Sequence, residues 1–495
     1  MKKRNNGFVY VFIVLFFIMF NVMAISNNII SKYGEFNIKR ILFVVFFVFI
    51  EILFLLLIDK IKNKKIETKF VVLFIPIGLM YLFAFPMNQT PDEGAHVFRA
   101  YEISMGHLVS TIKDNRFVGR KLPKNVPSTL GNDSYYKLFN NLDKKSDKDK
   151  EFVVFDNTAL YSFVCYIPQA LGIFISRIFT DRILVQLYVG RIFNFLTFVF
   201  LMYLSIKFIP IKKEFILFLG LLPMTLQEAI SLAPDSLTIS ASIFLFSYIM
   251  YLKEKNGLIT KKELLILSLF CLVISQCKIV YLPICLLLNL LPDNKFGSKK
   301  NKYLIIFSIA ILVVVLNLVW LKLASAFLSV SSGGKSTKQI VYILSNPLNY
   351  LMICGSTFNK NINSWIYQSL GKTLGWVNIF TPDIYILISL IIMFVLIVSY
   401  EKYKINVKDK LLLIFIFMST VVLIFTSLYV QWTDYKADGI SGIQGRYFLP
   451  LFILLPFIFL NNNFNVKKEK LSKYFYSFMV FENVLVIFII ILSYI

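Results

Sequence analysis

Long runs of apolar residues alternate with short polar segments along almost the whole chain. Apolar runs of ~17–25 residues match the ~30 Å hydrocarbon thickness of a bilayer, so we predict a membrane span from each run. Thirteen spans follow, at 8–25, 41–58, 70–87, 183–207, 214–231, 236–252, 264–277, 279–292, 303–325, 383–400, 411–429, 447–461 and 475–494. The predicted fold class is an all-α polytopic membrane protein.

One further apolar stretch, residues 159–179, is ambiguous. Counting it as a span would reverse the side of the membrane on which every later connection lies. Its helical spacing, the internal Pro168 and the flanking Arg177 and Arg182 favour an interfacial or re-entrant helix on the outer face. A full span remains the alternative.

The charge pattern gives these spans an orientation. The net charge is +24, and lysines concentrate in short connections at 59–69, 207–213, 253–263, 293–302, 401–410 and 461–474. Cytoplasmic connections collect Lys and Arg, which places the N-terminus inside and the C-terminus outside. We therefore predict an integral plasma membrane protein whose first helix is not cleaved, and membrane lipids rather than nucleic acid as its surroundings.

This topology divides the chain into five parts. They are N-terminal transmembrane helices (1–87), a first outer loop with an Asp-Glu motif and interfacial helices (88–182), central transmembrane helices (183–325), a second outer loop (326–382) and C-terminal transmembrane helices (383–495). The second loop is expected to open with a flexible segment, SVSSGGKST. The five cysteines are scattered and predict core packing rather than a disulfide framework.

Ionisable residues crowd one segment next to an apolar run. Residues 88–107 contain Asp92, Glu93, His96 and Arg99, and ionisable groups beside a bilayer are by default candidates for a functional site. We predict Asp92, Glu93 and His96 as catalytic, because adjacent carboxylates can serve as a general base or share a divalent cation. The structural alternative is that the acids cap the helix that follows, where negative charge suits the helix dipole.

Two further charges lie at predicted membrane boundaries. Asp235, in the sequence APDS, separates two apolar runs, and it either caps the helix that starts there or joins Asp92 on the same face. Lys278 separates two short apolar runs and either forms the tip of a hairpin or contacts a lipid phosphate. We count Arg99, Asp235 and Lys278 as candidate substrate-binding residues.

A third motif lies near the C-terminus. The chain contains 52 Lys and Arg residues, and only nine of them are Arg, with none between Arg191 and Arg446. Arg446 therefore suggests a need for a planar, bidentate donor that suits phosphate or carboxylate, although interfacial snorkelling is the simpler alternative. We predict that Gln444, Arg446 and Tyr447 contact the substrate.

Three of these segments resemble a known family when they are taken together. PDEGAHVFRAYEISMGHL, APDS and QGRYFLPL, in this order, resemble a family of bacterial multi-spanning membrane proteins of unassigned activity that is grouped with the GT-C superfamily of glycosyltransferases. The resemblance implies a GT-C-like bundle of about thirteen transmembrane helices with two larger outer loops. It covers most of the chain, and its motifs are short.

The resemblance also implies an activity. A GT-C-like enzyme would take a sugar from a polyprenyl-phosphate carrier and pass it to a glycan, lipid or protein acceptor on the outer face of the membrane. Asp92 would act as base or metal ligand with Glu93 second, Asp235 would match a later acidic motif, and Arg446 would bind the lipid phosphate, with Arg99 or Lys278 as further candidates. Mg²⁺ or Mn²⁺, held by Asp92, Glu93 and Asp235, would be an optional cofactor.

Two other classes of function stay open at this point. The first is a secondary transporter or flippase for a lipid-linked or anionic solute, although transporters usually show repeated halves and polar groups at mid-membrane. The second is a non-catalytic partner that keeps the fold of an enzyme. The chain has no Walker loop, GxSxG or HExxH motif, which argues against ATP-driven transport and against serine or zinc hydrolysis.

Overall fold

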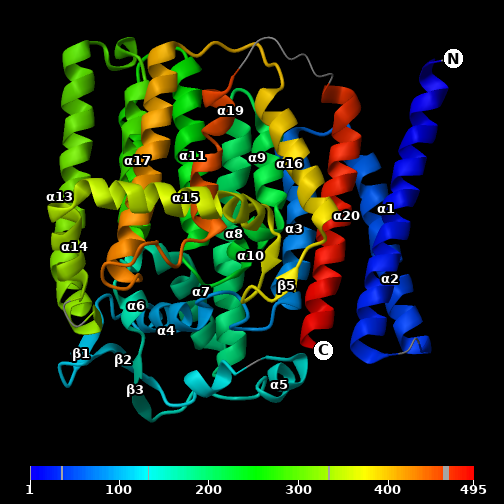
Figure 1. Cartoon of the computed structure of the whole chain (residues 1–495), viewed down its shortest axis with the longest axis horizontal. Coiled ribbons are helices and arrows are strands. Elements are labelled where there is room, and N and C mark those ends of the chain that lie inside the picture. Colours follow the sequence, from blue (N-terminus) through cyan, green and yellow to red (C-terminus); the bar gives the residue numbers. More distant parts are fainter. Residues whose placement is uncertain (1, 35–36, 132, 333–334, 461–467) are drawn as a thin grey trace.

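The computed structural model describes residues 2–34, 37–131, 133–332, 335–460 and 468–495, which are mostly helical (Figure 1). The longer helices are α1 (Lys2–Tyr33), α2 (Ile38–Ile61), α3 (Ile66–Ala84), α8 (Ile183–Phe208), α11 (Asp235–Glu254), α12 (Lys261–Cys277), α13 (Lys299–Ser332), α15 (Pro347–Leu370), α16 (Asp383–Val398), α17 (Val407–Gln431) and α20 (Lys468–Tyr494). The shorter α-helices are α4 (Glu93–Ser104), α5 (Tyr135–Asn140), α6 (Asp156–Ala159), α7 (Ile167–Phe179), α9 (Lys213–Leu221), α10 (Pro223–Ile230), α14 (Lys335–Ser345), α18 (Leu449–Phe452) and α19 (Leu455–Ile458). The 3₁₀ helices are η1 (Pro127–Thr129), η2 (Phe163–Tyr166), η3 (Ile279–Leu290), η4 (Asp293–Phe296) and η5 (Gly445–Phe448), and the strands are β1 (Thr111–Lys113), β2 (Phe117–Pro123), β3 (Lys150–Val154), β4 (Thr373–Leu374) and β5 (Ile379–Phe380).

Eight helices in the described part of the chain are long and apolar enough to cross a membrane. They comprise Phe8–Tyr33, Ile38–Ile61, Ile66–Ala84, Ile183–Phe208, Asp235–Glu254, Lys299–Leu328, Val407–Gln431 and Lys473–Tyr494. A helix of ~20 apolar residues is what a bilayer requires. The protein is therefore a polytopic helical membrane protein, as the apolar runs predict.

The other five predicted spans are short or broken, so the count of thirteen is not supported. Run 214–231 divides into α9 and α10, and run 447–461 divides into η5, α18 and α19. Pro223, Pro450 and Pro456 stand at the starts of α10, α18 and α19, because proline lacks the N–H that a continuing helix needs. The remaining three runs form the 3₁₀ helix η3 and the helices α12 and α16, of 17 and 16 residues.

The first two helices pack with the last one at one side of the molecule (Figure 1). The Asn21 side chain donates hydrogen bonds to Glu51 Oε1 (2.5 Å) and to the Phe481 carbonyl (3.2 Å), and it accepts one from the Tyr385 hydroxyl (2.5 Å). Polar groups within a bilayer need internal partners, so these bonds join α1, α2, α16 and α20.

The connections rich in lysine meet at one end of the molecule. Lys212 Nζ donates to the Ser399 carbonyl (2.7 Å), Lys253 pairs with Asp409 (2.5 Å), and Lys410 Nζ donates to the Leu460 carbonyl (2.9 Å). We call this the lysine-rich end. The helix α4, the strands β1–β3 and the C-terminus lie at the opposite end, which we call the α4 end (Figure 1).

The segment predicted as the first outer loop is folded at the α4 end. It contains a three-stranded antiparallel sheet in the order β1-β2-β3, in which Gly119 of β2 pairs with Thr111 and with Val154. The prediction of an all-α protein thus needs this small correction. Phe117 and Lys121 of β2 are exposed, whereas its residues 118, 119, 122 and 123 are buried, so the burial of this strand does not alternate strictly.

Residues 159–179 do not form a helix of spanning length. The stretch is divided among three elements: the end of α6, the 3₁₀ helix η2 and the 13-residue helix α7. Helix α7 packs against α4 and α8. The chain turns at the α4 end and enters α8, which runs toward the lysine-rich end (Figure 1). Its placement as an interfacial or re-entrant helix stays a prediction.

The segment predicted as the second outer loop is largely helical. Helix α13 continues to Ser332, α14 begins at Lys335, and α15 crosses the bundle at a steep angle to α17 (Figure 1). The described part of the segment predicted to be flexible is helical, Gly333 and Gly334 lie outside the described residues, and its flexibility stays a prediction. Ile340 and Leu344 are spaced i, i+4 and so share one helix face, a signal that the serines and glycines nearby obscured.

Candidate functional site

The Asp-Glu pair opens α4 in an unusual backbone conformation. Asp92 has φ 62° and ψ 0°, in the left-handed region, and it occupies the N-cap position without a capping hydrogen bond from its side chain. Left-handed residues other than glycine are uncommon and are found most often at functional sites. The carboxylate instead accepts a hydrogen bond from Arg446 Nη2 at 3.0 Å, so the capping alternative does not describe the side chain.

Glu93 has a different partner. Its two carboxylate oxygens bind Arg191 Nε (2.7 Å) and Nη2 (2.5 Å), and they also accept the backbone N–H groups of Asn88 (2.9 Å) and Leu232 (3.2 Å). Both side chains of the pair are fully buried. A carboxylate engaged in four hydrogen bonds is held by the fold, so this geometry favours a structural role over the predicted role of Glu93 as base or metal ligand.

Arg99 is likewise occupied within the fold. Its guanidinium pairs with Glu102 and donates to Ser110 Oγ (3.2 Å) and to the Leu108 carbonyl (2.8 Å). Glu102 binds Arg120 as well, at 3.0 Å. These contacts join α4 to the small sheet, so the prediction of Arg99 as a substrate-binding residue is not supported.

Arg446 is the centre of the remaining charges. It is 4% exposed and contacts Asp92 Oδ2 at 3.0 Å through Nη2 and Glu228 Oε1 at 3.4 Å through Nη1. Its Nε is buried and has no hydrogen-bond partner among the described residues. A buried N–H without a partner is costly, so an acceptor at this edge of the guanidinium would be stabilising; Nε of Arg99 is buried without a partner in the same way.

A second ion pair lies beside Arg446. Lys278 Nζ contacts Asp235 Oδ1 at 2.5 Å, and both side chains are largely buried. The ring of Tyr447 faces both cations, with its centroid 4.8 Å from Lys278 Nζ and 5.5 Å from Arg446 Cζ. Cations over an aromatic face are attracted by its quadrupole, so Tyr447 helps to hold the two positive charges close together.

His96 lies against the same cluster. Its Nδ1 is 2.7 Å from the Tyr166 hydroxyl. Burial lowers the pKa of His96 from 6.5 to about 4, an effect opposed by Asp235 and Asp92 and reinforced by Lys278 and Arg446. The imidazole is therefore neutral at pH 7. The sequence placed His96, Asp92, Asp235, Lys278, Arg446 and Tyr447 in one site, and the structure brings them together.

The low pKa of His96 predicts a pH dependence of stability. Between pH 4 and 6.5 the unfolded chain binds a proton at His96 that the native protein does not, so the free energy of unfolding rises with pH across this window. At 1.36 kcal/mol per pKa unit, the free energy of unfolding is lower at pH 4 than at neutral pH by about 3 kcal/mol through His96 alone. The unfolding temperature should fall less between pH 8 and pH 5 in His96→Gln than in the wild type. Equal falls would contradict a neutral His96.

A small cavity opens next to Arg446. It has a volume of about 60 Å³, and Pro91, Gln227, Gln444 and Arg446 are among its lining residues. Gln227 is oriented by the backbone N–H of Gly375, which donates to its Oε1 at 2.7 Å. The cavity gives Gln444 and Arg446, both predicted to contact substrate, a common polar space.

Gly445 positions Arg446 through close backbone packing on α15. A Cβ at this position would lie 2.3 Å from the Trp365 carbonyl oxygen and 2.5 Å from the Ser369 nitrogen. Gly445→Ala should therefore displace η5, lower the unfolding temperature and abolish any activity that needs Arg446. Gly355→Ala on α15 is the matched control, because a Cβ there would meet nothing within 4 Å. Equal behaviour of the two variants would show that this packing is dispensable.

The predicted metal ligands do not form a common set. Glu93 is paired with the buried Arg191, and Asp235 is paired with Lys278. Of the three predicted ligands, Asp92 is the one whose carboxylate stays partly exposed. Within the described ranges, no group of three His, Cys, Asp or Glu side chains is arranged to hold a metal ion. The residues thus do not fit the predicted Mg²⁺ or Mn²⁺, and we assign no chemical step to a metal.

Two residues of the site were missed in the sequence. Glu228 is 1% exposed within the apolar run 214–231, and Arg191 is fully buried within the run 183–207. An ionisable residue inside an apolar run is itself a signal of function, and that signal was available for both. What the sequence could not show is that Glu228 pairs with Arg446 while Arg191 pairs with Glu93.

Comparison with known proteins adds the family. A family model described as "Predicted membrane protein (DUF2142)" matches residues 73–455, which is more than half of the 495 residues and includes every residue of the cluster around Arg446. No curated protein and no solved structure matches the chain. The helices α1, α2 and α20 lie outside the matched part. The chain belongs to this family of predicted membrane proteins.

Proposed function

We propose that this protein is a GT-C-like glycosyltransferase. It moves a sugar from a polyprenyl-phosphate carrier to an acceptor on the outer face of the plasma membrane. The observation that carries the proposal is the pairing of a buried arginine that has a free N–H, Arg446, with a half-exposed carboxylate, Asp92. A lipid-borne donor also accounts for an enzyme embedded in the bilayer, since the substrate arrives through the membrane.

The guanidinium of Arg446 supports the phosphate part of this proposal. Nε and Nη2 lie on the same edge of the planar group, and this edge binds two oxygens of a phosphate or carboxylate side by side. Asp92 occupies Nη2, and Nε is free of any partner in the described structure. A phosphate oxygen at Nε would therefore lie next to the Asp92 carboxylate, and the Tyr447 ring contacts both Arg446 and Lys278.

Asp92 is the best candidate for the base. Its side chain is 39% exposed, compared with 5% for Asp235 and 1% for Glu228, so an acceptor hydroxyl reaches it most easily. The acceptor oxygen attacks the anomeric carbon and its proton passes to Asp92. The bond from that carbon to the phosphate oxygen breaks, and the lipid phosphate leaves with the electron pair toward Arg446. Such a base typically contributes ~10²–10⁴-fold, and fixed cations stabilise the departing charge.

The distribution of lysine supports the outer face as the location of the site. The lysine-rich end lies opposite the α4 end, and Lys and Arg collect in cytoplasmic connections. The α4 end then faces outward, with the N-terminus inside the cell. The acceptor is a glycan, lipid or protein of the cell envelope.

Cross-linking to a lipid probe tests the proposal. A photoactivatable polyprenyl monophosphate in proteoliposomes should label the wild type, and Arg446→Gln should reduce labelling ~10-fold or more, because a charge-assisted hydrogen bond to phosphate is lost. Arg182→Gln is the matched control, since Arg182 forms an exposed pair with Asp143. Equal labelling of Arg446→Gln and the wild type would contradict the phosphate site.

A further inference from the structure

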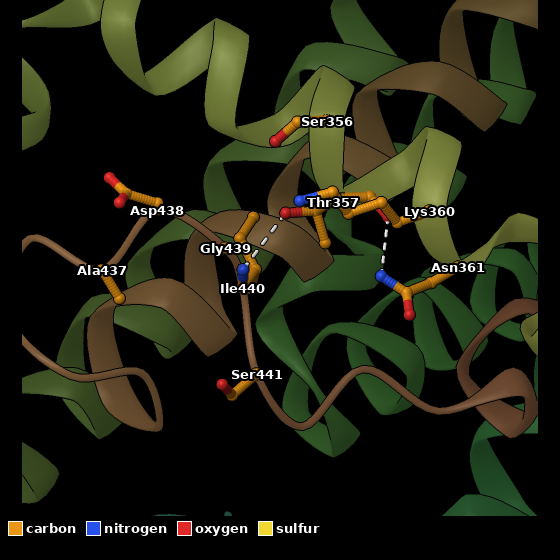
Figure 2. Close-up of a pocket in the computed structure, with 9 residues that line it drawn as sticks. All are labelled: Ser356, Thr357, Lys360, Asn361, Ala437, Asp438, Gly439, Ile440 and Ser441. Atoms are coloured by element: carbon orange, nitrogen blue, oxygen red, sulfur yellow. Dashed lines mark hydrogen bonds between the residues drawn. The ribbon is translucent and has the colours of Figure 1, made fainter.

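A larger cavity lies between α15 and the segment that leads from α17 to Arg446 (Figure 2). Its volume is about 320 Å³, at the lower limit of typical small-molecule sites. The lining residues come from two stretches of chain, Ser356–Asn361 on α15 and 437–441 in the connecting segment. None of them takes part in the proposed reaction.

The walls of this cavity are fixed by hydrogen bonds. The Ile440 N–H donates to Thr357 Oγ1 (3.1 Å), and Asn361 Nδ2 donates to the Thr357 carbonyl (2.9 Å), as Figure 2 shows. The Tyr429 hydroxyl donates to the Ala437 carbonyl (3.0 Å), and the Ser441 N–H donates to Thr433 Oγ1 (3.1 Å). Hydrogen bonds within the fold therefore hold the walls of the cavity in place.

Several polar groups around the cavity have unused bonding capacity. The side chains of the exposed residues Lys360, Asp438 and Ser441 form no hydrogen bond or ion pair with any residue the structure describes, and Oδ1 of the half-buried Asn361 accepts none. They offer donors and acceptors together, with one positive and one negative charge. This combination suits a neutral polyhydroxylated ligand, because each sugar hydroxyl both donates and accepts, whereas a free phosphate would meet no net positive charge.

A polar stripe on α15 connects this cavity to the reaction site. Thr357, Asn361, Ser364 and Gln368 are spaced by four, three and four residues, so they share one helix face. Gln368 lines the small cavity beside Arg446, and its Oε1 accepts the Gly445 N–H at 3.0 Å. The stripe from position 357 to 368 spans ~17 Å at the helical rise of 1.5 Å per residue, a length suited to a short run of linked sugars.

Exposed apolar side chains cover another part of the same helix. Leu348, Leu351 and Met352 are 75%, 59% and 65% exposed, which leaves an apolar surface of α15 uncovered by the described part of the chain. An amphipathic helix of this kind lies at a membrane surface with its polar face toward water. A water-soluble chain can therefore reach the cavity while the donor remains in the bilayer.

We propose that this cavity binds a sugar unit of the acceptor, some distance from the reacting hydroxyl, and that the acceptor is a glycan chain rather than a lipid or a protein. This inference rests on the proposed function, because an acceptor exists only if the protein transfers a sugar. Binding of a remote part of a substrate is a common way to position its reacting end. The cavity holds one unit, and the stripe on α15 guides the chain toward Asp92.

Binding of free trisaccharides tests this inference. The full chain in nanodiscs is titrated with neutral trisaccharides of glucose, of galactose and of N-acetylglucosamine, and saturation-transfer NMR reports binding. Asn361→Leu and Asp438→Ala should each weaken binding of the preferred trisaccharide ~10-fold, the effect of losing about one hydrogen bond to the ligand. Asp438 makes no contact that the fold needs, so its variant should keep the wild-type unfolding temperature. Asn359→Leu, an exposed position on the same helix, is the control and should bind normally.

The outcomes separate this inference from the proposed function. Wild-type binding by both cavity variants, or no binding of any trisaccharide by the wild type, would overturn the acceptor site. Labelling by the polyprenyl probe is measured on the same proteins and should be unchanged in Asn361→Leu and Asp438→Ala. Loss of trisaccharide binding in the cavity variants, with a wild type that the lipid probe never labels, would leave a sugar-binding cavity and reject the glycosyltransferase.

Discussion

Replacing Asp92 by asparagine is expected to lower sugar transfer ~100-fold or more, because the acceptor hydroxyl then loses its base. Asparagine suits the test, since it tolerates the left-handed backbone of Asp92 (φ 62°) better than most residues and its amide oxygen can still accept from Arg446. The measurement is transfer from polyprenyl-phosphate sugars to envelope glycans in proteoliposomes, with the amount of inserted protein held equal.

The control for this variant is Asp133→Asn. Asp133 is an exposed acid that pairs with Lys137 of α5 at 2.6 Å, and α5 lies at the α4 end of the molecule (Figure 1). It lies outside the cluster around Arg446, so its substitution should leave transfer unchanged. Full activity of Asp92→Asn would remove the base assignment.

Replacing Glu93 by glutamine is expected to destabilise the protein rather than to affect chemistry alone. Removing one partner of a buried ion pair typically costs about 3–5 kcal/mol, because the other charge stays buried without compensation. Here the uncompensated charge is that of Arg191, which also holds the carbonyls of Phe85 (2.7 Å) and Pro86 (3.2 Å) next to the Asp-Glu loop. Thermal unfolding in detergent, followed by the loss of monomeric protein, measures the effect.

An exposed ion pair provides the comparison for Glu93. Asp59 and Lys62 lie 3.4 Å apart with both side chains more than half exposed, and such pairs contribute about 0–1 kcal/mol. Asp59→Asn should therefore unfold almost like the wild type. If Glu93→Gln were equally stable and only inactive, Glu93 would be a catalytic residue, as its position next to Asp92 first suggested.

The membrane architecture could be predicted in outline because apolar runs report it directly. The helices that are long and apolar enough to cross a bilayer coincide with predicted runs, such as 183–207 with α8 and 411–429 with α17. The runs at 214–231 and 447–461 are also apolar over most of their length and yet are broken. Proline marks the breaks, but a proline inside a span is also tolerated, as Pro76 is within α3. Composition alone therefore could not give the number of spans.

The sequence could predict only those residues of the candidate site whose charge is unexpected at their position. Asp92, Asp235 and Arg446 stand at boundaries of apolar runs, where a charge needs an explanation, and the fold brings them together. Adjacent residues proved misleading. Asp92 faces Arg446, whereas Glu93, next to it in sequence, faces Arg191, because the first turn of α4 directs neighbouring side chains apart. Which arginine pairs with which carboxylate depends on how the helices pack, and the sequence does not show it.

A density map of the protein with a bound polyprenyl monophosphate tests the central claim most directly. The account predicts the phosphate at the α4 end, with one oxygen within hydrogen-bonding distance of Arg446 Nε and the Asp92 carboxylate beside it. A phosphate bound at the lysine-rich end, or one that makes no contact with Arg446, would contradict the account.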